Sequence, residues 1–148
     1  MKPQSESVTI VDADSLILGR MATIVAKRLL KGERIIVLNA EKSVVSGRKL
    51  SRVKETKAKL EIGHAGKGPY FYKQPDRFVK RVIRGMLPRQ KPKGKEAYKR
   101  LRVFIGAPQE FKDQHTETIA GARAEKLKCP YVTVGNLIRE IGWAPEGE

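Results

Sequence analysis

The sequence predicts a single α/β domain whose strands pair in a parallel sheet. Within about 32 residues, a run of β-branched residues, an amphipathic segment and a second apolar run follow one another, which is the order of a βαβ unit. Such a unit is expected to place both strands in one sheet, joined by a right-handed crossover. The length of 148 residues and the hydrophobic content of 40% suffice for one domain with its own core.

The N-terminal unit divides into a strand, a helix and a strand. Residues 8–11 (VTIV) are all β-branched and favour extended backbone. Apolar residues at spacings of three and four then predict an amphipathic helix up to Leu30, and Gly32 is placed to end it. Residues 34–39 (RIIVLN) are short and nearly all apolar, as in a strand that is covered on both faces.

The middle of the chain is expected to be helical and basic. After a short extended piece at residues 43–45, residues 48–60 contain no Pro or Gly and predict a helix with a thin apolar stripe. Residues 63–72 (GHAGKGPYFY) form a glycine-rich loop that closes in a Tyr-Phe-Tyr cluster. A helix is expected over residues 75–87, because a proline stands at its first position and another directly follows it.

Towards the C-terminus the predicted elements are shorter. Residues 91–95 (KPKGK) are rich in Pro and Gly and predict an irregular basic turn, followed by a short helix at 96–101. Residues 102–106 predict a strand, and residues 134–141 predict a terminal helix that ends at a glycine. The stretch 107–130 is polar and poorly periodic, so no element is assigned to it.

The charge is strongly positive and is confined to one section of the chain. There are 31 Lys and Arg against 16 Asp and Glu, a formal net charge of +15. Residues 42–102 hold 20 of the basic residues and four acidic ones, a net charge of +16, so the rest of the chain carries −1. An ordinary basic enzyme would spread its cations among acids. This layout is typical of a protein that binds a polyanion, and nucleic acid is the usual one in the cytosol.

The sequence carries no membrane, secretory or metal-binding signal. Its apolar runs are far shorter than the ~18 residues of a membrane span, and the polar N-terminus has no apolar signal-peptide region. Cys129 is the single cysteine and cannot form an internal disulfide. His64 and His115 are the only histidines, and Cys129 has no second cysteine at metal-ligand spacing. We therefore expect a cytosolic protein without bound zinc, in which Cys129 is a small buried hydrophobe.

A nucleotide-binding enzyme has to be considered, because a βαβ unit opens the chain. The strand-to-helix turn at residues 12–15 (DADS) lacks the glycines that a pyrophosphate needs, and its two carboxylates would repel phosphate. The glycine-rich loop also fails as a P-loop, since residues 66–68 are GKG. Asp12 and Asp14 could act as general acid and base in an enzyme that works on RNA or nucleotides. We interpret them instead as part of the helix start, with Asp14 and Ser15 as candidate N-caps.

The strongest charge signal lies in the helix expected over residues 75–87. One of its faces is apolar and comprises Phe78, Val82, Ile83, Met86 and Leu87. Another carries cations at i, i+3, i+4 and i+7, namely Arg77, Lys80, Arg81 and Arg84. Like charges at this spacing destabilise a helix slightly, so the pattern indicates neutralisation by phosphates. In the preceding loop, Lys67 is expected to lie against phosphates. Tyr70 is a candidate for stacking on unpaired bases, with at least one residue of the 70–72 cluster in the core.

Five segments share their order and spacing with one known family. They are residues 10–13 (IVDA), 18–22 (LGRMA), 37–42 (VLNAEK), 46–48 (SGR) and, most specifically, 82–88 (VIRGMLP). They resemble the thirteenth protein of the large ribosomal subunit, the L-thirteen family. Two further segments, residues 101–106 (LRVFIG) and 134–143 (VGNLIREIGW), are similar to the archaeal branch of that family.

The resemblance implies a three-layer α/β/α domain with a small parallel sheet. It further implies a structural constituent of the large ribosomal subunit in the cytoplasm, which binds large-subunit ribosomal RNA, supports subunit assembly and touches neighbouring ribosomal proteins. No catalysis, cofactor, metal, membrane or small-molecule substrate is implied. Carried onto matching positions, the RNA-facing segments would be residues 47–49, the loop 67–73, Arg84 with Arg89, and the turn 91–95.

Charge pattern and resemblance together define a candidate RNA-binding set. We expect residues 42–102 to face RNA within one domain of residues 1–148, and residues 1–7 to form a flexible tail. The candidate residues are Arg48, Lys49, Arg52, Lys67, Tyr70, Lys73, Arg77, Lys80, Arg81, Arg84, Arg89, Lys91, Lys93 and Lys95.

Overall fold

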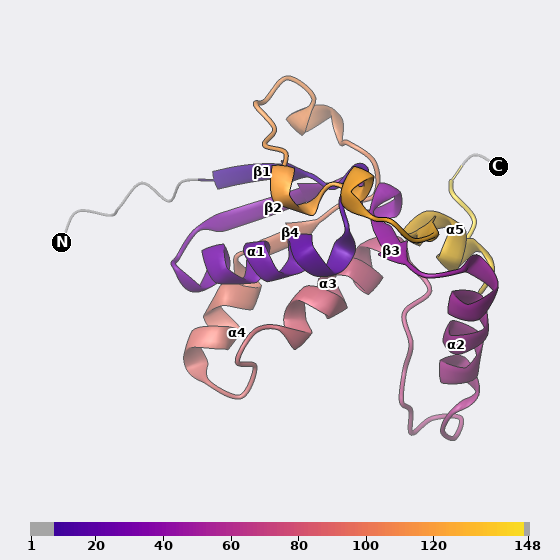
Figure 1. Ribbon diagram of the computed structural model, residues 1–148. Coiled ribbons are helices and arrows are strands. Elements are labelled where there is room, and N and C mark those ends of the chain that lie inside the picture. Colours follow the sequence, from indigo (N-terminus) through magenta and orange to yellow (C-terminus); the bar gives the residue numbers. More distant parts are fainter. Residues whose placement is uncertain (1–7, 147–148) are drawn as a thin grey trace.

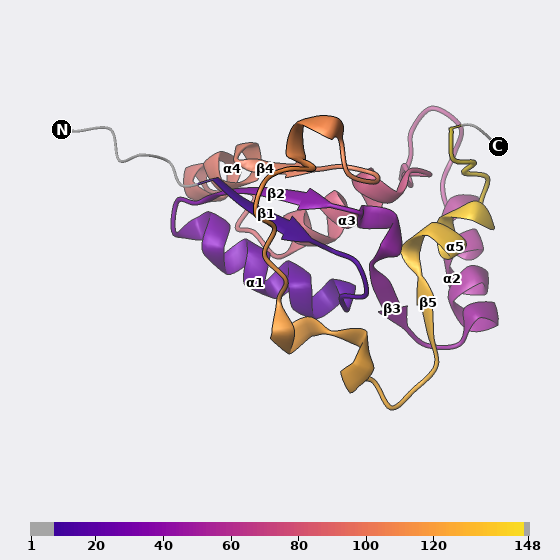
Figure 2. The ribbon, with the colours of Figure 1, turned by 90° about the horizontal axis from the view of Figure 1, so that it is seen from above.

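The computed structural model describes residues 8–146 of the chain, so the flexible tail expected at residues 1–7 lies outside them. Figure 1 shows a small sheet with helices packed along one side of it, and Figure 2 shows the same ribbon from above. Helices alternate with the strands of a parallel sheet, which confirms the predicted α/β class.

The sheet has three parallel strands in the order β1-β2-β4. They are β1 (Val8–Asp12), β2 (Arg34–Leu38) and β4 (Leu101–Val103), and Ile36 in the central strand pairs with Ile10 on one side and Arg102 on the other. α1 (Leu18–Leu30) connects β1 to β2, so the predicted βαβ unit is confirmed. β4 begins one residue earlier than expected and is shorter.

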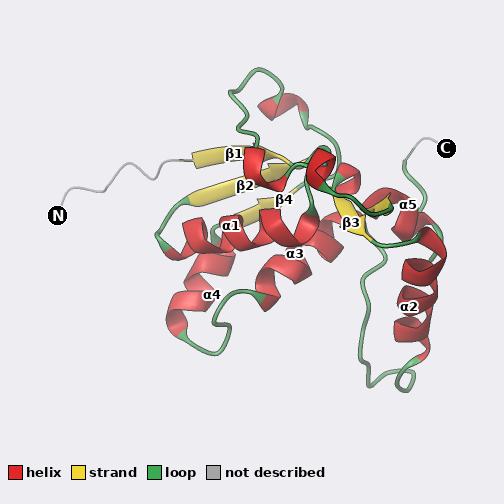
Figure 3. Cartoon of the chain, viewed as in Figure 1, coloured by secondary structure: helices red, strands yellow, loops and turns green. Residues whose placement is uncertain are grey.

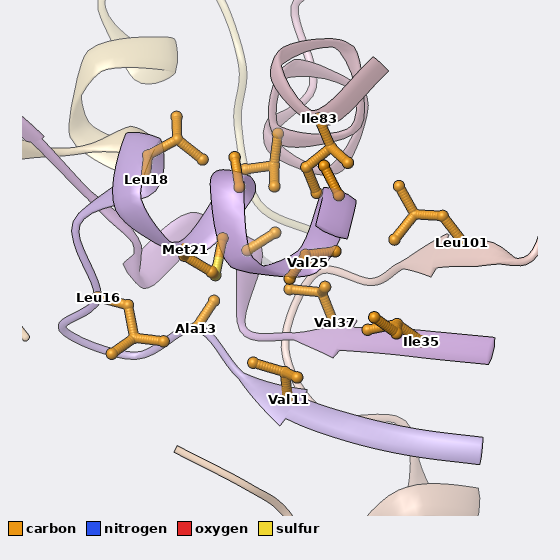
Figure 4. Packing of buried hydrophobic residues seen from close by; sticks show 14 of the residues in the cluster. Val11, Ala13, Leu16, Leu18, Met21, Val25, Ile35, Val37, Ile83 and Leu101 are labelled. Atoms are coloured by element: carbon orange, nitrogen blue, oxygen red, sulfur yellow. The ribbon is translucent and has the colours of Figure 1, made fainter. Parts of the chain in front are cut away.

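α1 and α3 (Pro75–Gly85) cover one face of the sheet and bury most of the core. Val11 and Leu101 point from the sheet into this layer, where they meet Val25 of α1 and Ile83 of α3 (Figure 4). These four side chains are at most 1% exposed. Burial on this scale, about 25 cal/mol per Å² of apolar surface, fixes how α3 lies against the sheet.

The opposite face of the sheet is covered by irregular chain. Ile10 and Leu38 point this way and are also buried. At the free edge of β1 the same segment pairs in the plane of the sheet, where the backbone N–H of Glu117 donates to the Ile10 carbonyl (2.8 Å) and that of Asp12 donates to the Glu117 carbonyl (3.1 Å). A 3-10 turn, η2 (Gln109–Phe111), lies above these strands (Figure 1). Among the described residues this third layer contains no α-helix, because its sequence lacks the apolar spacing with which a helix could bury one face.

A second, two-stranded sheet stands at the end of the molecule. β3 (Val44–Ser46) pairs antiparallel with β5 (Tyr131–Thr133), which leads directly into α5 (Val134–Arg139). α2 (Lys49–Glu61) packs beside α5. The predicted extended piece and both helices are confirmed. β5 was not predicted, because three residues carry too little pattern to indicate a strand whose partner lies far away in the sequence.

The interpretation of Asp14 and Ser15 as N-caps is wrong. α1 begins later, its N-cap is Ile17, and no side chain caps it. Ser15 adopts a left-handed conformation with φ of 57°. Asp12 has the local structural role instead, because its Oδ1 accepts hydrogen bonds from the Asp14 backbone N–H (3.0 Å) and from Nδ2 of Asn39 (2.9 Å). The carboxylate thereby joins the chain after β1 to the chain after β2.

The expectation of an irregular turn at residues 91–95 is also wrong. α4 (Pro92–Lys99) begins at a proline, which suits the first helical position because no N–H is needed there. Gly94 is buried, and a Cβ at this position would lie 2.1 Å from the carbonyl oxygen of Pro88. Glycine therefore allows the first turn of α4 to approach the preceding chain closely.

Two side chains lie differently from their predicted places. Met86 was assigned to the apolar face of α3, but the helix ends at Gly85 and Met86 is 42% exposed. Val79 is fully buried on that face instead. Cys129, which was expected to be buried, is exposed in the loop before β5.

Candidate nucleic-acid interface

α3 presents its cations on the side turned away from the core. Val79 and Ile83 are fully buried and therefore fix the rotation of the helix. Four cations occupy the remaining side, which we call the α3 face: Arg77, Lys80, Arg81 and Arg84. All four line one open hollow of about 200 Å³, so the structure brings them together as their spacing predicts.

Aromatic rings hold three of these cations in place. Lys80 Nζ lies 5.0 Å from the ring centre of Tyr98 in α4, and Arg77 Cζ lies 5.9 Å from that of Tyr72. Arg81 Cζ is 5.8 Å from the same Tyr72 ring. A cation over a ring face keeps its N–H donors, so it is oriented without being neutralised. None of the described residues that line the hollow is acidic.

Arg81 also ties the preceding loop to α3. Its Nη1 donates to the carbonyl oxygen of Tyr70 (2.7 Å), and its guanidinium lies 6.0 Å from the ring centre of Phe71. Phe71 in turn packs on Phe78 of α3, with ring centres 6.0 Å apart. Sequence reasoning assigned Arg81 to phosphate contact alone. Its bond to a backbone carbonyl has no signal in the sequence.

Residues 62–74 form the long loop between α2 and α3 (Figure 3). Tyr70 is 69% exposed, and Lys67 and Lys73 are exposed beside it. Phe71 is half-buried against the core, so the expectation that part of the aromatic cluster packs inside is confirmed. Gly63 has φ of 102°, and a Cβ there would lie 2.1 Å from the carbonyl oxygen of Gly68, so the tight return of this loop requires glycine.

The candidate residues of α2 are partly committed to the fold. Lys49 Nζ pairs with Glu140 (3.1 Å). Arg52 donates from Nε to the Ser46 carbonyl (2.7 Å) and from Nη1 to Glu55 (3.1 Å). Arg48 precedes the helix and is exposed. These contacts anchor α2 to β3 and α5, and they leave Arg48 as the more accessible cation of the three.

Four further candidates lie around the start of α4. Arg89 and Lys91 are exposed in the turn after α3, and Lys93 and Lys95 are exposed on the first turn of α4. The contact between Lys80 and Tyr98 joins α4 to α3, and both helices pack on α1. Figure 1 shows α3 and α4 together on the side of the sheet opposite η2.

A cation outside this region shows the contrasting arrangement. Arg28 of α1 donates from Nη1 to both carboxylate oxygens of Glu117 (3.1 and 3.0 Å) and from Nε to Glu33 (2.8 Å). Burial lowers the pKa of Arg28, but the bonds to Glu117 and Glu33 outweigh it and raise that pKa above its ordinary value. The charge of Arg28 is therefore neutralised by ion pairs within the protein, unlike the charges of the α3 face.

The described residues offer little for other chemistry. Between residues 8 and 146, no three His, Cys, Asp or Glu side chains gather closely enough to hold a metal ion. The helices of the same range are all too short or too polar to cross a bilayer. Asp12, the candidate catalytic acid, is engaged in the two hydrogen bonds described above.

The sequence matches known proteins over most of its length. Residues 6–110 match the family model described as ribosomal protein L13. The chain is 43% identical over 145 residues to a protein of Archaeoglobus fulgidus, and this alignment covers 97% of this chain and 93% of the relative. It is 46% identical over 137 residues to a Methanosarcina barkeri protein, an alignment that covers 91% of this chain and 98% of the relative. It is 41% identical over 145 residues to a Methanopyrus kandleri protein, with 96% of this chain and 91% of the relative covered. All three are named large ribosomal subunit protein uL13.

Proposed function

The chain belongs to the ribosomal protein L13 family, and from this premise we propose that it binds large-subunit ribosomal RNA through the α3 face and supports assembly of that subunit. The family is one of large-subunit ribosomal proteins and not of enzymes. The observation that carries the proposal is the α3 face itself. Its four cations share one hollow that no described carboxylate lines.

This arrangement suits the phosphate backbone of RNA. Arginine guanidinium groups present N–H donors in a planar fork that matches phosphate oxygens, and Arg77, Arg81 and Arg84 supply three of them. Tyr72 and Tyr98 hold neighbouring cations at 5.0–5.9 Å, so less side-chain freedom is lost on binding. Each neutralised phosphate releases counterions, so affinity should depend strongly on salt.

The exposure of each candidate side chain decides which contact with RNA we propose for it. The α3 face, Arg48 and the exposed cations of the loop and of α4 are the proposed phosphate contacts, which adds Lys67, Lys73, Arg89, Lys91, Lys93 and Lys95. Tyr70 is the proposed stacking residue because most of its ring is exposed. Lys49 and Arg52 are proposed as secondary contacts, since both already pair with carboxylates. The proposed setting is the cytoplasmic large subunit, among RNA and neighbouring ribosomal proteins.

The alternative of an RNA- or nucleotide-acting enzyme gains nothing from the structure. It rested on Asp12 and Asp14 at the strand-to-helix turn. Asp12 accepts two hydrogen bonds that connect the ends of β1 and β2, which explains the carboxylate without catalysis. The nearby hollow that Asp12 lines also contains Asp14 and Glu125, with Arg123 as the single cation among its described lining residues, so its net charge is unfavourable for phosphate.

Charge reversal on the α3 face tests the proposal. We expect Arg77→Glu with Arg84→Glu to weaken binding to large-subunit ribosomal RNA in a filter-binding assay, while the melting temperature stays near that of the parent protein. Lys126→Glu with Lys128→Glu is the matched control, because both lysines are exposed and the net charge changes equally. The segment 120–130 that carries them runs on the side of α1 away from α3 (Figure 2). Equal weakening by the two pairs would show that net charge, and not this face, governs binding.

A further inference from the structure

A second basic hollow lies on the face of the sheet opposite α3. It measures about 560 Å³, and its cations come from β2, β4 and the end of α4. We call it the far-face hollow. Its principal lining residues are Arg34, Lys99, Arg100, Arg102, Phe111 and Gln114. None of these is one of the fourteen individual candidate residues, although Lys99, Arg100 and Arg102 belong to the basic section of residues 42–102.

The alternation of strand residues places this hollow on the far side. In β4, Leu101 is buried in the core beneath α1 and α3, so its neighbour Arg102 points to the other face, where it is exposed. In β2, Ile35 faces the core, so Arg34 and Ile36 face away from it. The register pairs Ile36 with Arg102, which brings these residues together. The sheet therefore separates the far-face hollow from the α3 face.

No carboxylate among the described residues lines the far-face hollow. The acids at the edge of the sheet, Glu33 and Glu117, are both bonded to Arg28 on the other side. Arg100 donates from Nη2 to the Leu29 carbonyl (2.7 Å), a neutral acceptor, and its Nε is buried without a partner. Lys99, Arg100 and Arg102 lie around one hollow and repel one another, and an anion between them would relieve that repulsion.

Apolar side chains also line the hollow. They are Ile36, Phe111 and Val8, and Val8 is 53% exposed. Cations mixed with apolar side chains suit a chain that combines phosphates with ribose and base surfaces, and three of the four cations are arginines.

We propose that the far-face hollow binds the sugar-phosphate backbone of a second RNA segment, so that the protein bridges two segments of large-subunit RNA across its sheet. The inference rests on the proposed function, because it requires that the α3 face holds the first segment. It adds a second contact surface, formed by Lys99, Arg100 and Arg102 together with Arg34.

Directed hydroxyl-radical probing tests this bridge in assembled large subunits. Cys129→Ser removes the only cysteine, after which Gln114→Cys or Gln90→Cys carries an iron–EDTA group. Gln114 lines the far-face hollow, and Gln90 is exposed beside Arg89 in the turn after α3. We expect each position to produce RNA cleavages, in two sets that do not overlap.

The outcomes separate the two proposals. RNA cleavage from Gln90→Cys without cleavage from Gln114→Cys would overturn the bridge and leave the proposed function standing. Cleavage of the same nucleotides from both positions would also overturn it, because a single segment would then be in reach. Absence of RNA cleavage from both positions would contradict the proposed function itself, because neither face would then lie near RNA. If a protein neighbour occupies the far-face hollow instead, the Gln114→Cys probe will cleave the backbone of that protein and no RNA. This result would also overturn the bridge.

A double substitution that removes two positive charges provides a second test, measured as the salt dependence of RNA affinity. Lys99→Gln with Arg102→Gln removes two exposed cations of the far-face hollow and leaves the buried face of β4 unchanged. We expect the slope of log affinity against log salt, measured with large-subunit RNA, to become shallower by about 1.4–1.8, the value for two lost phosphate contacts. The control pair Lys126→Gln with Lys128→Gln should leave the slope unchanged. An unchanged slope in the Lys99 and Arg102 variant, with an unchanged melting temperature, would overturn the inference.

Discussion

Replacing Val79 by alanine tests how α3 is rotated against the core. Val79 is fully buried, whereas Met86, which the sequence pattern had placed on the same apolar face, is 42% exposed. Val79→Ala removes two buried carbon groups, worth ~0.8 kcal/mol each, or about 1.6 kcal/mol in all. The cavity that remains brings the expected loss to about 2–3 kcal/mol.

The assay is thermal unfolding followed by circular dichroism. For a chain of this size each kcal/mol lowers the melting temperature by about 2–4 °C, so Val79→Ala should lower it by about 4–12 °C. Met86→Ala is the matched control and should cost less than about 1 kcal/mol, because Met86 is already 42% exposed and buries far less of its side chain than Val79 does. Neither change touches a cation, so RNA affinity well below the melting temperature should stay the same.

An equal loss of stability in the two variants would refute this reasoning. It would mean that Met86 packs as deeply as Val79, and that α3 is rotated towards the arrangement that the sequence pattern suggested. The cations of the α3 face would then no longer share one hollow.

Three further substitutions test the local structure around the site. Gly94→Ala should destabilise the protein by about 1–3 kcal/mol, because its Cβ would lie 2.1 Å from the Pro88 oxygen, whereas Gly19→Ala, with open space around it, should be neutral or slightly stabilising in the same denaturant titration. Asp12→Asn keeps the Oδ1 acceptor and should leave the free energy of unfolding nearly unchanged, while Asp12→Ala should cost about 1–3 kcal/mol; a large loss in both would point to a role for the negative charge. Cys129 should react with a thiol reagent in the folded protein as readily as in urea, and protection by folding would contradict its exposure.

The sequence predicts much of the core because the core follows local periodicity. Spacings of three and four in α1, and the apolar run of β2, are properties of short windows and need no knowledge of distant residues. The cations of the α3 face are predictable for the same reason, since the burial of Ile83 on one side of the helix places Arg77 and Arg84 on another.

The features that the sequence did not predict depend on contacts between distant segments. β5 is a strand only because β3 lies beside it, and Gly94 can sit inside a helix because the Pro88 carbonyl approaches it closely. Arg81 bonds to a backbone carbonyl that any residue at position 70 would supply. The far-face hollow gathers Arg34 and Arg102 through strand register, and 68 positions separate them in the chain.

The salt dependence of RNA binding shows whether the cations of the α3 face neutralise phosphates. The measurement compares the parent protein with the neutralised pair Arg77→Gln and Arg84→Gln, using large-subunit ribosomal RNA from low to moderate salt. We expect the slope of log affinity against log salt to be shallower by about 1.4–1.8 in this variant, and to be unchanged in the control pair Lys126→Gln with Lys128→Gln. A slope equal to that of the parent protein in the Arg77 and Arg84 variant would contradict the claim that the α3 face binds phosphates.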